Sequence, residues 1–112
     1  HFMKRLLFLL CLFICSATAY ANGYEGTYKA VETKYSFKTL VVGPDTFQNR
    51  IRYWFVDDKG SRSIYDVAEK VKSGRYKIIS NDRNYLLFKG YVVEVHHVGS
   101  TGWVDVFQKV KE

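Results

Sequence analysis

Alternation of apolar and polar side chains from Thr46 to Val56 is the pattern that most restricts the fold of this chain. Successive side chains of a strand point to opposite faces, so a period of two predicts one long strand with a single buried face. The buried face would carry Phe47, Ile51, Tyr53 and Phe55. The opposite face would carry Arg50, Arg52 and Trp54.

Shorter β patterns lie on both sides of this strand. From Thr27 to Val42 the chain is typical of β structure, with a one-residue slip in the apolar phase that predicts a bulge. Gly43-Pro44-Asp45 is expected to form a hairpin corner. Four more strands are expected: Tyr76 to Ser80, Tyr85 to Phe88, Tyr91 to Val98 and Trp103 to Val110.

The segment from Ser61 to Ser73 fits two periods. A short helix is favoured, because Ser63 can cap it and Gly74 stands where it would end. The apolar positions at helical spacing are Ile64, Val67, Ala68 and Val71. The alternative is a strand through Tyr65, Val67, Glu69 and Val71, joined to the next strand by Ser73-Gly74.

Six or seven strands with short connections predict a mainly β fold, a small antiparallel β-barrel or sandwich with one short helix. The segment Tyr24-Glu25-Gly26-Thr27-Tyr28 resembles the Gly-x-Trp start of lipocalin-like barrels, with Tyr28 in place of Trp. This resemblance covers only a few residues and implies architecture, with no ligand residue. The order of strands, helix and further strands is also similar to that of an OB-fold.

The first 21 residues are interpreted as a cloning remnant, His1-Phe2, followed by a secretory signal peptide. A positive start, Met3-Lys4-Arg5, precedes an apolar run, and Ala19-Tyr20-Ala21 provides the small residues before a cleavage site. The run from Leu6 to Ala17 is too short for a membrane span, which needs ~20 residues. We therefore expect cleavage near Ala21, no stable membrane anchor afterwards, and a periplasmic or secreted single domain, residues 22–112.

The expected cleavage near Ala21 decides which cysteines and which charged residues remain in the domain. Both cysteines, Cys11 and Cys15, lie in the expected signal peptide, so residues 22–112 must fold on their apolar core without a disulfide. Neither cysteine is preceded by the small residue of a lipobox, which argues against lipid attachment. Without Lys4 and Arg5, 15 basic residues face 11 acidic ones, a net charge of +4 that suits an anionic surface or an acidic protein partner. Export argues against a nucleic-acid partner.

Motifs of catalysis are absent from the sequence. Residues 22–112 contain no cysteine, no Gly-x-Ser-x-Gly, no phosphate-binding glycine loop and no zinc-binding helix motif. Asp57-Asp58 is expected in a turn, as solvated carboxylates. On one strand His96 and His97 point to opposite faces, so Glu94 and His96 alone make half of a metal site. The sequence thus predicts no catalytic residue, no metal and no cofactor.

Aromatic residues are dense, with eight Tyr, five Phe and two Trp in residues 22–112. The residues expected in the interior are Phe37, Phe47, Ile51, Phe55 and Phe107. Those with polar atoms that suit a rim or an interface are Tyr53, Trp54, Tyr85, Tyr91 and Trp103.

These observations favour a non-enzymatic exported binding module that recognises another protein, as an inhibitor or an immunity-type protein does. Arg50, Arg52 and Trp54 are the expected partner-binding residues, serving binding rather than folding. Two alternatives stay open: a small lipocalin-like carrier of an apolar ligand, and a hydrolase with an unrecognised site. The oligomeric state is left open.

Overall fold

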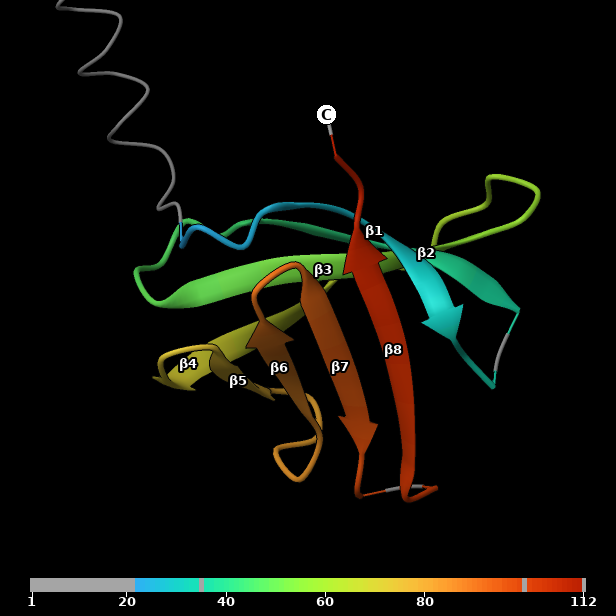
Figure 1. Ribbon diagram of the computed structural model, residues 1–112. Coiled ribbons are helices and arrows are strands. Elements are labelled where there is room, and N and C mark those ends of the chain that lie inside the picture. The colour runs from blue at the N-terminus through green and yellow to red at the C-terminus, as the bar shows by residue number, and fades with distance from the viewer. Residues whose placement is uncertain (1–21, 35, 100, 112) are drawn as a thin grey trace, which may run out of the picture.

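A computed structural model describes residues 22–34, 36–99 and 101–111, and these form a closed antiparallel barrel of eight strands (Figure 1). Each strand pairs with its neighbours in the sequence, and β8 closes the ring by pairing with β1. The strands are β1 (Gly26–Glu32), β2 (Phe37–Pro44), β3 (Arg50–Asp57), β4 (Asp66–Lys72), β5 (Arg75–Ile78), β6 (Tyr85–Lys89), β7 (Val92–His97) and β8 (Trp103–Lys109).

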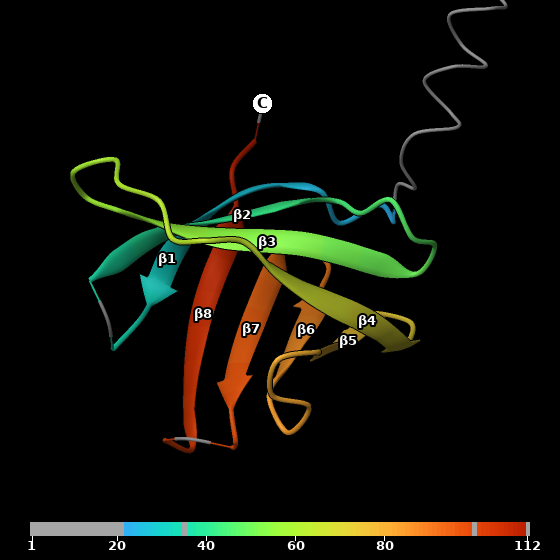
Figure 2. The same cartoon turned by 180° about the vertical axis from the view of Figure 1, so that it is seen from behind.

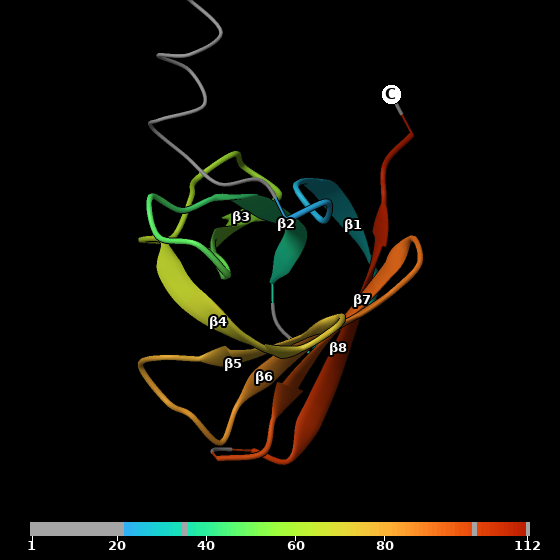
Figure 3. The same ribbon diagram turned by 90° about the vertical axis from the view of Figure 1, so that its left-hand side faces the viewer.

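Because successive strands run in opposite directions, the connections between them lie alternately at the two ends of the barrel. The first end carries residues 22–25 and the connections β2–β3, β4–β5 and β6–β7. The second end carries the connections β1–β2, β3–β4, β5–β6 and β7–β8. Figures 1 and 2 show β2 and β3 lying across the direction of β6, β7 and β8, and Figure 3 shows the strands surrounding the interior.

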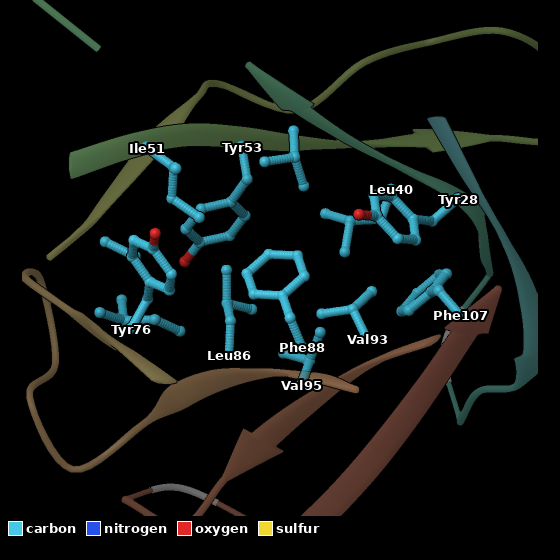
Figure 4. Packing of buried hydrophobic residues seen from close by; sticks show 13 residues of the cluster. Tyr28, Leu40, Ile51, Tyr53, Tyr76, Leu86, Phe88, Val93, Val95 and Phe107 are labelled. Atoms are coloured by element: carbon cyan, nitrogen blue, oxygen red, sulfur yellow. The ribbon is translucent and has the colours of Figure 1, made fainter. Parts of the chain in front are cut away.

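Side chains fill the barrel. In the close-up, side chains from β3 and from β6 to β8 point toward one another across the interior (Figure 4). This is the expected result for eight strands, whose ring is just wide enough for side chains to meet. The buried hydrophobic residues are Tyr28, Leu40, Val42, Ile51, Tyr53, Ala68, Tyr76, Ile78, Leu86, Phe88, Val93, Val95 and Phe107.

The segment before β1 covers the first end of the barrel. The ring of Tyr24 stacks on that of Phe88, with 4.4 Å between centroids. The hydroxyl of Tyr76 donates to Asn22 Oδ1 at 3.2 Å, and the hydroxyl of Tyr28 donates to the Tyr24 carbonyl at 2.7 Å. The first end is therefore covered by aromatic rings, and the hydroxyl groups of Tyr28 and Tyr76 are paired with the segment before β1.

The mainly β barrel and the bulge in the first strand are confirmed, since the β1–β8 register shifts between Ala30 and Glu32. The count of six or seven strands was too low, because the β segment from Thr27 to Val42 is two paired strands, β1 and β2, and because β4 lies where a helix was favoured. The predicted helix from Ser61 to Ser73 is wrong, and its strand alternative is correct: the region contains β4. Without a helix, the described residues follow an eight-strand up-and-down order, not the order of an OB-fold.

Two predictions around the β2–β3 hairpin are also wrong. Gly43 and Pro44 belong to β2, and the turn follows them, with Asn49 in the left-handed region at φ 63°. The turn includes Phe47, and the alternation of β3 starts only at Arg50. The Phe47 side chain is therefore 63% exposed instead of buried. The alternation placed Tyr53 correctly on the buried face, where it is 5% exposed, and its polar atom does not bring it to a rim or an interface.

Predictions about the first 21 residues, namely the cloning remnant, the signal peptide and its cleavage near Ala21, lie outside the described residues. Within the described ranges, no helix is long and apolar enough to cross a membrane.

Replacing Gly74 by alanine should destabilise the barrel by roughly 2 kcal/mol or more, since left-handed strain alone costs ~1–3 kcal/mol. Gly74 has φ 78°, and an added Cβ would lie 2.8 Å from the Phe88 carbonyl oxygen. That contact cannot relax easily, because the Phe88 amide donates to the Gly74 carbonyl at 2.7 Å. Gly60→Ala is the matched control, with φ 85° but no atom within 4 Å of the new Cβ. Urea unfolding should show the larger loss for Gly74→Ala, and equal losses would contradict the steric argument.

Candidate functional site

The outer face of β3 carries the three residues that the sequence analysis singled out. Arg50, Arg52 and Trp54 are partly exposed there, and they alternate with the buried Ile51 and Tyr53. The alternation therefore placed all three correctly outside the core.

Each of these residues takes part in a contact between an arginine and an aromatic ring. The guanidinium carbon lies 5.2 Å from the Phe47 ring centroid for Arg50, 5.0 Å from that of Tyr65 for Arg52, and 4.4 Å from that of Trp54 for Arg62. Such pairs are attractive because the face of an aromatic ring is electronegative. We call this set the aromatic–arginine surface: Phe47, Arg50, Arg52, Trp54, Arg62 and Tyr65.

Loops at both ends of β3 supply half of this surface. Phe47 comes from the β2–β3 turn, whereas Arg62 and Tyr65 come from the β3–β4 connection. Nearby in that connection, Ile64 is 91% exposed, and Tyr65 is 48% exposed. The sequence did not reveal these three members: the alternation assigned Phe47 to the interior, and Arg62 and Tyr65 lie in the segment where a helix was favoured.

Carboxylates hold two of the arginines in place. Arg50 Nε lies 3.0 Å from Glu69 Oε2 on β4, and Arg52 Nε lies 2.8 Å from Asp45 Oδ1 at the end of β2. Burial by itself would raise the pKa of Asp45, but the Arg52 side chain and the backbone amides of Thr46 and Phe47 outweigh it. The pKa of Asp45 is therefore below its usual range, and its carboxylate is charged at neutral pH.

Arg52 consequently has a part in folding, contrary to the expectation that it serves binding alone. The Asp45 side chain is 6% exposed, so removal of Arg52 would leave a buried carboxylate without its cationic partner. The sequence signal for Asp45 was its place in Gly43-Pro44-Asp45, where a carboxylate commonly bonds the backbone of the following residues. That signal located a turn, and only the structure pairs Asp45 with Arg52.

A small cavity opens at the second end of the barrel. It has a volume of about 150 Å³ and is lined by Thr33, Phe37, Phe55, His97, Asp105 and Phe107. Phe37 and Phe55, expected in the interior, thus form part of its wall and are only partly buried.

Asp105 is the buried charged group of this cavity. Its side chain is 3% exposed and lies 2.8 Å from His97 Nε2. The Trp103 indole and the backbone amide of Lys34 both donate to the other oxygen, at 2.8 and 3.0 Å. Asp105 was not among the predicted site residues, although its spacing of two from Phe107, which was expected in the interior, puts both side chains on the same face of the strand.

His97 and Asp105 resemble the base and orienting carboxylate of a hydrolytic site. Thr33 supplies the only hydroxyl side chain of the cavity's described lining, which contains neither serine nor cysteine. The rest of that lining is phenylalanine, so the polar groups here can orient one another and hold the strand ends together.

His96 points away from this cavity, and the opposite orientation of the two histidines is confirmed. His96 Nε2 lies 3.0 Å from Glu94 Oε1 on the outer face of β7. The hydrogen bond from His96, with further contributions from Lys89, lowers the pKa of Glu94 despite partial burial. Nowhere in the described part of the chain do three His, Cys, Asp or Glu side chains come together to hold a metal ion.

Comparisons with known proteins give no relative from which a site could be transferred. No family model matches the chain, and neither a curated protein nor a solved structure matches it significantly. The function therefore has to be inferred from the residues themselves.

Proposed function

We propose that residues 22–112 form a non-enzymatic, exported binding module that recognises another protein, in the manner of an inhibitor or an immunity-type protein. The aromatic–arginine surface is the observation that carries this proposal, with three arginines against three aromatic rings on one outer face. Tryptophan, tyrosine and arginine are the residues most enriched at the energetic centres of protein interfaces. Periplasmic or secreted location is proposed with it, on the strength of the leader sequence.

Preorganisation of the arginines supports binding at this surface. Association costs roughly 0.5–1.5 kcal/mol for each flexible side chain that it immobilises. Arg50 and Arg52 are already held by Glu69 and Asp45, and each also lies against a ring. A partner that docks here would lose less of its binding free energy to ordering these side chains.

The carrier alternative has less support. Thirteen hydrophobic side chains occupy the interior, and the second-end cavity holds about 150 Å³. Pockets for small ligands usually have ~300–1,000 Å³. Recognition on the outside of the barrel therefore fits the packing better than transport inside it.

The hydrolase alternative would rely on His97 and Asp105. Nucleophilic catalysis also requires a nucleophile within hydrogen-bond reach of the base and donors for the developing oxyanion. The cavity's described lining offers only the hydroxyl of Thr33 for the first role and three phenylalanines around it. This makes an enzymatic role the weaker proposal.

The test is retention of a partner by immobilised residues 22–112 from an envelope extract of the source cells, with the retained protein identified by mass spectrometry. Trp54→Ala combined with Arg62→Ala removes one stacked pair and leaves the bonds of Arg50 and Arg52 intact. We expect the partner's affinity to fall by roughly 30-fold or more, since truncation of an interface centre costs ~2 kcal/mol.

Tyr91→Ala combined with Lys111→Ala is the matched control, because it removes an exposed aromatic residue and a cation elsewhere. This control should retain the partner. Thermal unfolding should place both variants within a few degrees of the parent protein. Equal retention by the Trp54 and Arg62 variant would show that the aromatic–arginine surface is not the binding site.

A further inference from the structure

The positive charge of the domain is concentrated in one stretch of sequence. Between Lys70 and Lys89 there are six basic residues and one acidic residue, Asp82. The remainder of residues 22–112 has nine basic and ten acidic residues. A net charge of +5 thus lies between Lys70 and Lys89, from the end of β4 to the end of β6, and −1 in the rest of residues 22–112.

A groove of about 320 Å³ lies on the outer surface of these strands. Lys72, Arg75, Lys77 and Arg83 line it, and Val71 and Tyr85 supply the apolar part of its wall. We call it the basic groove. Asp82 also lines it, and Glu69 Oε1 lies 3.7 Å from Lys77 Nζ, so two carboxylates offset part of its charge. Four cations against two carboxylates leave a net attraction for anions.

Tyr85 helps to decide which anion the groove fits. Its ring centroid lies 4.0 Å from the Arg75 guanidinium carbon and 4.3 Å from the His96 ring, which stacks on it at 11°. Arg75 and His96 come from β5 and β7, the two strands that flank β6. Single-stranded nucleic acids bind by stacking their bases on open aromatic faces. The Tyr85 ring is already packed by Arg75 and His96, so the groove fits a nucleic acid poorly.

The concave shape of the groove argues against a lipid surface. A bilayer is flat on this scale, so its headgroups could contact the cations at the rim of the groove but could not fill it. The groove instead matches an extended acidic peptide. The carboxylates of such a peptide can pair with the cations, and its side-chain methylene groups can contact the apolar part of the wall.

We propose that the basic groove binds a carboxylate-rich segment of a protein. This inference rests on the proposed function, to which it adds the chemistry of the partner. The groove also adjoins the aromatic–arginine surface, because Glu69 contacts Arg50 on that surface and Lys77 in the groove. One partner can therefore place an acidic segment in the groove and apolar side chains against the rings.

Fluorescence anisotropy with a labelled oligoglutamate peptide tests the groove directly. Residues 22–112 should bind it at low ionic strength and lose affinity steeply toward roughly 0.15 M salt, where charges are screened beyond ~8 Å. Lys72→Glu combined with Arg83→Glu, both at exposed positions, should weaken binding about tenfold or more. Lys38→Glu combined with Lys59→Glu makes the same charge change elsewhere and should weaken it much less.

Three outcomes would overturn the inference. Equal weakening by the two charge-reversal pairs would show a general effect of net charge with no site. Binding to single-stranded DNA or to phosphatidylglycerol vesicles, but not to the peptide, would assign the groove to another class of ligand. Peptide binding that is insensitive to salt would exclude an electrostatic site.

Partner retention tests the aromatic–arginine surface and peptide anisotropy tests the basic groove, so the failure of one proposal can be distinguished from the failure of the other. Trp54→Ala combined with Arg62→Ala should leave peptide binding in place, because neither residue lines the groove. If peptide binding stands and no protein is retained from the envelope extract, the aromatic–arginine surface fails and the groove remains a site for acidic segments.

Discussion

Phe107→Ala is expected to lower the free energy of unfolding by ~3–5 kcal/mol, the range for truncating a buried aromatic residue. Phe107 is fully buried on β8, its ring lies 6.0 Å from that of Phe55, and it borders the second-end cavity. The truncation would enlarge a space that is already empty of side chains, which limits relaxation. In a small domain whose total stability is ~5–15 kcal/mol, much of the margin would be lost.

Phe47→Ala is the matched control for this substitution. The chemical change is the same, but Phe47 is 63% exposed, so the loss should be within about 0.5 kcal/mol. Urea unfolding followed by circular dichroism measures both. Similar losses for the two variants would mean that Phe47, as the alternation predicted, lies in the interior after all.

Alkaline unfolding is the second large effect that we expect. Burial, followed by the nearby Glu25 and Tyr24, raises the pKa of Tyr28 and Tyr76 to about 12 from the ordinary value of 10.0. The folded state therefore holds these protons more tightly than the unfolded state. The stability they contribute is complete below pH 10, and it is lost as the pH rises toward 12. Two pKa units correspond to at most ~3 kcal/mol for each residue.

Circular dichroism across this pH range, together with tyrosinate absorbance, measures the effect. Tyr28→Phe combined with Tyr76→Phe removes both phenols and should move the alkaline transition to higher pH. Tyr91→Phe changes an exposed phenol and should leave the transition where it is. Ionisation of every tyrosine near pH 10 with the barrel intact would refute the argument.

Strand alternation predicted the barrel and the outer face of β3, because a single buried face imposes a strict period of two. It failed at Phe47 for a local reason. Phe47 lies in the turn between β2 and β3, which ends at Asn49 in the left-handed region. The alternating pattern of the sequence runs through this turn without a break, so the pattern alone does not show that β3 begins only at Arg50.

The error from Ser61 to Ser73 has a different cause. Ile64, Val67, Ala68 and Val71 have helical spacing, yet Ile64 is 91% and Val71 57% exposed, and only Ala68 is buried. These four residues therefore do not form an apolar stripe that a helix could bury against the core. The backbone of β4 is hydrogen-bonded to β3 and β5 and not within a helix. Tertiary pairing of this kind overrides local helical preference.

The candidate site was predictable only in part. Arg50, Arg52 and Trp54 follow from their positions on one strand, whereas Asp45 and Tyr65 reach Arg52 from different connections. Contacts between loops and strands depend on the closure of the barrel, which a local pattern does not encode.

The closed first end has a consequence for processing of the chain. The backbone nitrogen of Asn22 lies 2.5 Å from Glu25 Oε1. Cleavage at the expected site after Ala21 would convert this neutral amide into an ammonium group, which adds an ion pair to a hydrogen bond that the Glu25 carboxylate already strengthens. On the proposed cleavage, this ion pair would help to hold residues 22–25 over the first end of the barrel. A peptide fused before Asn22 would keep the amide neutral, and the ion pair would be absent.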